Sequence, residues 1–107
     1  MPTWGLLSNH AMVLLHVASH RNVTLREISM AVGLTERAVI RIVHELEDEG
    51  VMSHVKDGRR NLYQLNYRAV LSHLQAQTQP FTLEDIAAQV QALARQVREE
   101  DALDETA

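Results

Sequence analysis

The chain has 107 residues, 46% of them hydrophobic, with ten basic and fourteen acidic side chains and no cysteine. This length suits one small domain with a single hydrophobic core, and the lack of cysteine excludes disulfides, thiolate metal sites and cysteine nucleophiles. The opening segment has no basic start and its apolar run, from Ala11 to Ala18, is short. We therefore expect neither a signal peptide nor a membrane span, and a cytoplasmic location.

The net charge of −4 is distributed unevenly. Residues 1–66 hold seven basic and seven acidic side chains, whereas residues 67–107 hold three and seven. Five of the latter acids lie between Glu99 and Glu105, and a terminal run of this kind is typical of a solvated, disordered tail. We therefore predict a disordered acidic tail, and the overall charge does not argue against a nucleic-acid partner for residues 1–66.

Capping residues mark the starts of three predicted helices. Ser8 precedes an apolar helix that ends near residue 19. Thr24 is followed by Glu27 at the spacing of a capping box, and Thr82 is followed by Asp85 at the same spacing. Each cap lies between two apolar residues that can pack across the first turn, which strengthens the prediction of a helix start.

Between residues 24 and 50 the pattern predicts two helices joined by a very short connection. Gly33 can adopt the left-handed conformation that ends the first helix, Thr35 can cap the second, and Gly50 ends it. The second helix carries an apolar stripe at helical spacing. Its members are Val39, Ile42, Val43 and Leu46.

After Gly50 the apolar period changes from that of a helix to that of a strand. Residues 51–55 and 62–65 read as two strands joined by a turn at 56–60, which contains Asp57-Gly58 and looks longer than two residues. Asn66 can cap a further helix, and residues 75–80 read as a linker to the helix that begins near Thr82. Three helices followed by a hairpin predict a mainly α fold with a small β-hairpin (α+β), a winged helix-turn-helix.

The second helix of the helix-turn-helix, at about 35–49, is expected to enter the major groove of DNA. Arg37 and Arg41 are four residues apart, so they share a face at a spacing suited to a guanine edge and a neighbouring base or phosphate. Ile40 beside them could contact a thymine methyl group. The predicted DNA-facing set is Thr35, Glu36, Arg37, Ile40, Arg41 and His44.

The predicted wing, at about 51–66, carries its own basic cluster. Arg59 and Arg60 are expected at the hairpin tip with Lys56 nearby, where they could neutralise phosphates or enter a narrow minor groove. Arg37 and Arg41 could instead pair with Glu36 or Glu45 on the helix surface. Exposed pairs of that kind contribute under ~1 kcal/mol, so pairing alone explains little.

Residues 15–65 resemble winged helix-turn-helix transcriptional regulators of the MarR/ArsR type. The resemblance rests on the segment TLREISMAVGLTERAVIRIVHELEDEG and on the wing KDGRRNLYQL. It implies a bacterial or archaeal dimeric regulator, with the helix from Thr35 in the major groove and Arg59 and Arg60 near phosphate or the minor groove. ArsR-type metal sensors commonly use cysteine ligands, which this chain lacks.

Residues 67–107 are expected to form C-terminal helices that dimerise the protein. The last helix has apolar residues at alternating steps of three and four, which is a heptad seam. Its members are Leu83, Ile86, Val90, Leu93 and Val97. Folding of this short helix onto its own core is the alternative, but pairing doubles the DNA contacts and sets two half-sites about one helical turn apart.

Six histidines raise the question of a metal site. His16 and His20 share a helix face, but two ligands fall short of the three or four that zinc requires. No motif for phosphate binding, nucleophilic catalysis or acid–base catalysis is present in the sequence. We therefore predict no enzyme, no metal and no cofactor.

The sequence predicts a sequence-specific, double-stranded DNA-binding transcriptional regulator that acts as a homodimer, and as a repressor because no segment resembles a polymerase contact. The sequence allows a small-molecule effector but does not identify one. The alternatives are a winged-helix protein–protein interaction module in a larger assembly, with Ile40 at its centre, or a binder of RNA or of replication origins. Substitution of Arg41 or Arg59 separates these functions, because an interaction module would be indifferent to both.

Overall fold

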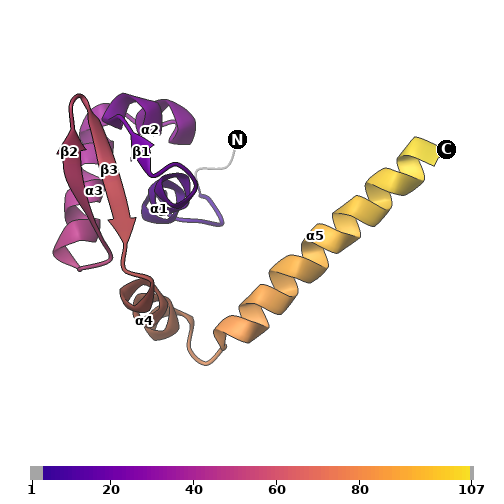
Figure 1. Cartoon of the computed structure of the whole chain (residues 1–107). Helices are drawn as coiled ribbons and strands as arrows, with labels where there is room; N and C mark the ends of the chain where they lie inside the picture. Colours follow the sequence, from indigo (N-terminus) through magenta and orange to yellow (C-terminus); the bar gives the residue numbers. More distant parts are fainter. Residues whose placement is uncertain (1–3, 107) are drawn as a thin grey trace. The chain divides into compact units, whose positions relative to one another are not determined.

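The structure is a computed structural model that describes residues 4–106, and these form two compact units divided between Val70 and Leu71. In the first unit α1 (Asn9–Ser19), α2 (Leu25–Val32) and α3 (Glu36–Asp48) pack on one another and on a small sheet (Figure 1). The sheet contains β1 (Asn22–Val23), β2 (Met52–Asp57) and β3 (Arg60–Leu65). Two helices complete the described chain, α4 (Tyr67–Thr78) and α5 (Leu83–Thr106).

Side-chain capping starts these helices where the sequence indicated. The hydroxyl of Ser8 accepts a hydrogen bond from the backbone N–H of Ala11 at 3.1 Å. Thr24 and Glu27 form the reciprocal capping box of α2, with bonds of 3.0 and 3.2 Å. Each bond satisfies a backbone N–H that the first turn of a helix leaves without a partner. These local predictions are confirmed.

The core of the first unit is formed by apolar side chains from all three helices and the sheet. Removing each large aliphatic side chain from water contributes about 1.5–3 kcal/mol, so together they drive the folding of this unit. The buried cluster is Val13, Val17, Val23, Ile28, Val39, Ile42, Val43, Met52 and Tyr63. Three of the four residues predicted for the stripe of α3 are fully buried there, and Leu46 is partly buried against the cluster.

The sheet has three strands, whereas the sequence analysis predicted only a hairpin. The strand order is β1-β3-β2, and β1 pairs antiparallel with β3, with Asn22 opposite Leu62 and Val23 opposite Asn61. The added strand is only two residues long, so it shows no alternation that could be recognised in the sequence. It joins the wing to the segment between α1 and α2.

The hairpin turn is shorter than predicted. Asp57 pairs with Arg60, so only Gly58 and Arg59 form the loop. Gly58 has φ of 64°, and no other residue type among those described has a positive φ. A glycine of positive φ at the first of two loop positions is typical of a type II′ turn, whose twist matches that of the strands. The prediction of a longer loop was wrong.

Two predictions about the C-terminal part are also corrected. Residues 75–78, predicted as linker, belong to α4, and the acidic residues 99–104, predicted as a disordered tail, belong to α5. From residue 83 to 106 the chain contains no glycine or proline and is rich in alanine, leucine, glutamate and glutamine. These residues favour a helix, so the acidic side chains lie exposed along a continuing helix.

Candidate nucleic-acid interface

The connection between α2 and α3 is as tight as a helix-turn-helix requires. Gly33 ends α2 in the left-handed conformation with φ of 71°, and its N–H donates to the carbonyl of Ser29 at 3.0 Å. Two residues later the Thr35 hydroxyl accepts from the N–H of Ala38 at 3.1 Å and caps α3. A non-glycine residue at position 33 would be strained by its positive φ.

Burial of one stripe of α3 leaves the opposite face exposed. At 100° per residue the buried Val39, Ile42 and Val43 lie on one side of the helix, and Arg37, Ile40, Arg41 and His44 lie on the other. Ile40 is 38% exposed. Glu36 is also exposed but lies beside this face, and Thr35 caps the helix.

Arg41 makes one side-chain hydrogen bond among the described residues. Its Nη1 donates to Oε1 of Glu45 at 3.0 Å, one helical turn further along α3. Oε2 of the same carboxylate lies 2.6 Å from Nε2 of His10, which comes from α1. Two hydrogen bonds lower the pKa of Glu45 below its ordinary value. The bond from His10 has the larger effect, and the bond from Arg41 has the smaller one. The pairing of Arg41 with Glu45, one of the alternatives from the sequence, is therefore present.

The wing carries two exposed cations at or beside its tip. Arg59 occupies the second position of the two-residue turn, and Lys56 lies near the end of β2. Neither side chain makes a hydrogen bond or ion pair with another described residue. The structure thus agrees with the expected exposure of both cations.

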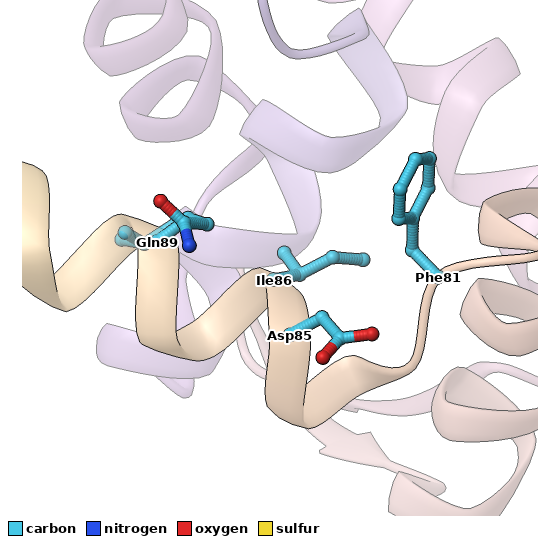
Figure 2. Close-up of a pocket in the computed structure, with 5 residues that line it drawn as sticks. Phe81, Asp85, Ile86 and Gln89 are labelled. Atoms are coloured by element: carbon cyan, nitrogen blue, oxygen red, sulfur yellow. The ribbon is translucent and has the colours of Figure 1, made fainter.

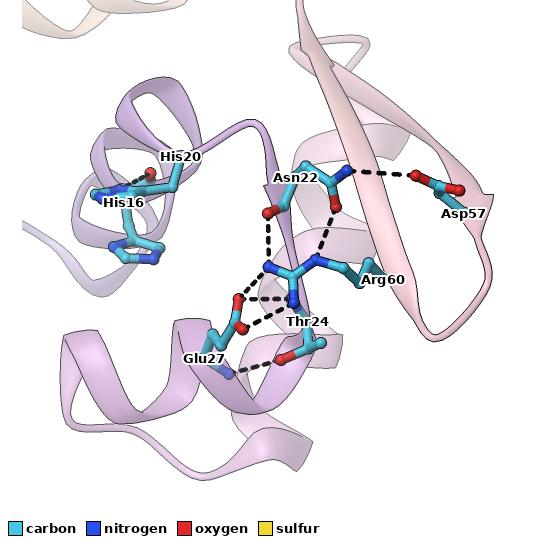
Figure 3. Close-up of polar contacts among 7 residues, drawn as sticks. All are labelled: His16, His20, Asn22, Thr24, Glu27, Asp57 and Arg60. Carbon is cyan, nitrogen blue, oxygen red and sulfur yellow. Dashed lines mark hydrogen bonds and ion pairs between the residues drawn. The ribbon is translucent and has the colours of Figure 1, made fainter.

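Arg60 is arranged differently from its predicted place at the tip. It is the first residue of β3, and each of its guanidinium nitrogens donates to the protein body (Figure 3). Nη1 and Nη2 donate to the two carboxylate oxygens of Glu27 at 3.0 and 2.9 Å, and Nε donates to the side-chain oxygen of Asn22 at 3.0 Å. Nη2 also donates to the backbone carbonyl of Asn22 at 2.9 Å.

These contacts tie the wing to β1 and to the start of α2. Paired, parallel bonds between a guanidinium and a carboxylate fix orientation better than a single contact does. The hydrogen bonds from Arg60, and then the one from the Thr24 backbone, lower the pKa of Glu27. On the other strand Asp57 accepts a bond of 3.3 Å from the side chain of Asn22. We name this group, Asn22, Glu27, Asp57 and Arg60, the wing brace.

Sequence reasoning missed the wing brace because it assigned its members to other roles. Glu27 was recognised as a capping residue and Arg60 as a tip cation. A signal did exist in the return strand: Arg60, Leu62 and Gln64 share one face of a strand, opposite to the buried Asn61 and Tyr63. Without the unpredicted β1, nothing in the pattern identified what that face would contact.

The histidine pair on α1 does not form a metal site with other described residues. The rings of His16 and His20 are stacked with centroids 4.5 Å apart, and Nδ1 of His20 lies 3.2 Å from the carbonyl of His16. Burial of the ring is the main cause that lowers the pKa of His16, and the neighbouring His20 lowers it further. Residues 4–106 contain no group of three or more histidine, aspartate or glutamate side chains suited to a metal ion.

The second unit exposes the residues predicted for dimerisation. Val90 and Leu93 are 59% and 65% exposed, Ile86 and Val97 are also exposed, and Leu83 is half-buried.

An open depression of about 260 Å³ lies at the start of α5, lined by Phe81, Asp85, Ile86, Gln89 and Val90 (Figure 2). The Asp85 carboxylate in it accepts from the N–H of Thr82 at 3.0 Å and so completes the helix cap. Over the described range no helix combines the length and apolar character needed to cross a bilayer.

The sequence matches no family model and no curated protein, but solved structures share its fold. The transcriptional regulator PcaV from Streptomyces coelicolor, in complex with its natural ligand, is 21% identical over 86% of this chain and 74% of its own, with a TM-score of 0.52.

Two further structures give similar values. ZitR, a zinc-responsive MarR family member from Lactococcus lactis, is 20% identical over 92% of this chain and 78% of its own, with a TM-score of 0.51. MepR, a transcription regulator of the Staphylococcus aureus multidrug efflux pump MepA, is 16% identical over 88% of this chain and 80% of its own, with a TM-score of 0.51. The protein therefore has the winged helix-turn-helix fold of MarR-type transcriptional regulators, as the resemblance in its sequence implied.

Proposed function

We propose that this protein is a sequence-specific DNA-binding transcriptional regulator. The observation that carries the proposal is the exposed face of α3, where Arg37, Ile40 and Arg41 lie opposite the apolar stripe that packs into the core. A guanidinium can donate two hydrogen bonds to a guanine edge, and an exposed isoleucine finds an apolar partner in a thymine methyl group. A solved structure of ZitR in complex with DNA, from a protein of the same fold, supports this use of the fold.

In the proposed complex the residues divide into base readers and backbone contacts. Arg37, Ile40, Arg41 and His44 read base edges in the major groove. Thr35 caps the N-terminus of α3, where backbone N–H groups favour phosphate, and the Glu36 carboxylate, which repels phosphate, can accept from a cytosine amino group. Lys56 and Arg59 contact phosphate or the minor groove. Arg60 acts within the wing brace and sets the position of these two cations, because its guanidinium is occupied by Glu27 and Asn22.

We propose further that the protein acts as a homodimer held by α5 and as a repressor. The stripe of Leu83, Ile86, Val90, Leu93 and Val97 supports the dimer, because exposed apolar residues at heptad spacing favour a helical partner. A dimer that covers two half-sites would exclude polymerase from an overlapping promoter. We propose no small-molecule effector, because no cluster of polar side chains among the described residues identifies a ligand.

The experiment is selection of duplexes from a randomised library, followed by fluorescence anisotropy at several salt concentrations. Arg41→Ala should reduce the preference for the selected sequence by roughly 1–3 kcal/mol, whereas Arg59→Ala should weaken all duplexes alike and lower the salt dependence. Arg95→Ala, which removes the same charge from α5, is the matched control. Failure to enrich any sequence, with both variants unchanged, would favour the protein-interaction alternative.

A further inference from the structure

Glu45 joins two helices at the edge of the proposed DNA-reading face. His10 from α1 lies 2.6 Å from one of its carboxylate oxygens, and Arg41 of α3 lies 3.0 Å from the other. The contact from His10 does not follow from the helix-turn-helix pattern, because His10 and Glu45 are 35 residues apart in the sequence. We name this group the His10–Glu45–Arg41 relay.

The direction of the hydrogen bonds in the relay follows from the charge of Glu45. Its pKa lies below the ordinary value, so it is a carboxylate at neutral pH and can only accept. Both partners must then donate, His10 through Nε2–H and Arg41 through Nη1. Because each oxygen is held from a different helix, the carboxylate has less rotational freedom than one paired only along α3.

Restraint of Glu45 matters because Arg41 is otherwise a mobile side chain. An arginine loses much rotamer entropy when its side chain is fixed, and an isolated pair four residues apart on an exposed helix offsets only a small part of that loss. The side chain of Arg41 is 62% exposed, so little packing holds it. With Nη1 bonded to Glu45, the edge formed by Nε and Nη2 makes no hydrogen bond with described residues and suits the two acceptors of guanine.

We propose that His10 is a positioning residue for DNA recognition: it holds Glu45, and Glu45 holds Arg41 with its Nε–Nη2 edge presented to a guanine. This inference rests on the proposed function, since it requires α3 to read bases. His10 itself does not touch DNA. Its removal would therefore reduce discrimination at the base pair read by Arg41 and leave the contacts of the wing unchanged.

The test measures a specificity ratio, which is the affinity for the selected duplex divided by the affinity for a duplex with one base pair changed. The changed base pair is the one at which Arg41→Ala abolishes the sequence preference. His10→Ala should lower this ratio about three- to tenfold. His10→Gln, whose side-chain amide can still donate to Glu45, should restore most of it. His73→Ala, at an exposed position of α4, is the matched control and should leave the ratio unchanged. Far-UV circular dichroism of each variant checks that it folds.

Coupling between the positions gives the decisive comparison. In an Arg41→Ala background His10→Ala should cause no further loss, because the side chain that it positions is absent. An unchanged ratio in His10→Ala, when Arg41→Ala loses the preference, would overturn the inference and leave the proposed function intact. A uniform rise in affinity for every duplex would also overturn it, since Glu45 would then mask Arg41. If Arg41→Ala alters no preference, the proposed reading role and the inference both fail.

Discussion

The two compact units use apolar residues in opposite ways. In the first unit nine apolar side chains from three helices and the sheet form one buried cluster, whereas no residue between 71 and 104 is buried. Both units have helices with capped starts and apolar stripes, so their sequences look equally regular. The difference teaches that periodicity establishes a helix and its apolar face, but a second surface is required before that face contributes to stability.

The largest expected effect is loss of the core of the first unit. Ile42→Ala removes a fully buried side chain of α3 and should lower the free energy of unfolding by about 2–5 kcal/mol, measured by urea denaturation. The matched control on the same helix is Ile40→Ala, which should change stability by less than about 0.5 kcal/mol. Equal losses from the two substitutions would contradict the assignment of Ile40 to the exposed face.

Substitutions in the second unit should change the oligomeric state of the protein. Val90→Asp combined with Leu93→Asp places charge on the exposed stripe of α5 and should convert the proposed dimer to monomer in sedimentation velocity. The unfolding midpoint of the first unit should not move. Gln91→Asp adds a charge on the opposite side of the same helix and should leave the dimer mass unchanged. A double variant that remains dimeric would remove α5 from the interface.

Capping boxes at Thr24 and Thr82 allow the same change to be made in both units. Thr24→Ala should lower the free energy of unfolding of the first unit by about 1 kcal/mol, because α2 is part of its core. Thr82→Ala should instead increase amide hydrogen exchange only in the first turns of α5. If both substitutions shifted the unfolding midpoint of the first unit equally, the two units would not be independent.

The smallest expected effect concerns the wing brace, and it is detected as a change of stability with pH. The pKa of Glu27 lies below its ordinary 4.5 because of the hydrogen bonds from Arg60 and then from the Thr24 backbone. A folded-state pKa below the unfolded one stabilises the fold above about pH 4.5, and this contribution is lost as pH falls through the folded-state value. Native protein and Glu27→Gln should therefore differ in stability near neutral pH and converge in acid.

Solvent exposure keeps this difference small, since both partners are close to half exposed. Glu100→Gln on α5 serves as the control, because its side chain is exposed and lies outside the wing brace. Its stability should follow that of the native protein at every pH. A gap between native and Glu27→Gln that persists undiminished at low pH would show that the ionised carboxylate is not its source.

Much of the fold was predictable because it depends on short-range interactions. Caps at Ser8, Thr24 and Thr82 bond to backbone groups three residues away, and Gly33 ends a helix through its own backbone conformation. The disordered tail was predicted wrongly for a related reason. That prediction rests only on the charge of the acidic run, whereas the absence of glycine and proline from residues 83–106 favours a continuous helix.

By itself the sequence determined the order of the helices, the helix-turn-helix, the wing and the exposed face of α3, since each follows from spacing and from contacts within a few residues. Only the tertiary structure decided the pairing of β1 with β3, the bonding of Arg60 to Glu27 and the link from His10 to Glu45. The last two of these contacts join polar side chains 33 and 35 residues apart. Single polar residues carry no periodic signal, so their partners become defined only when the apolar core brings the elements together.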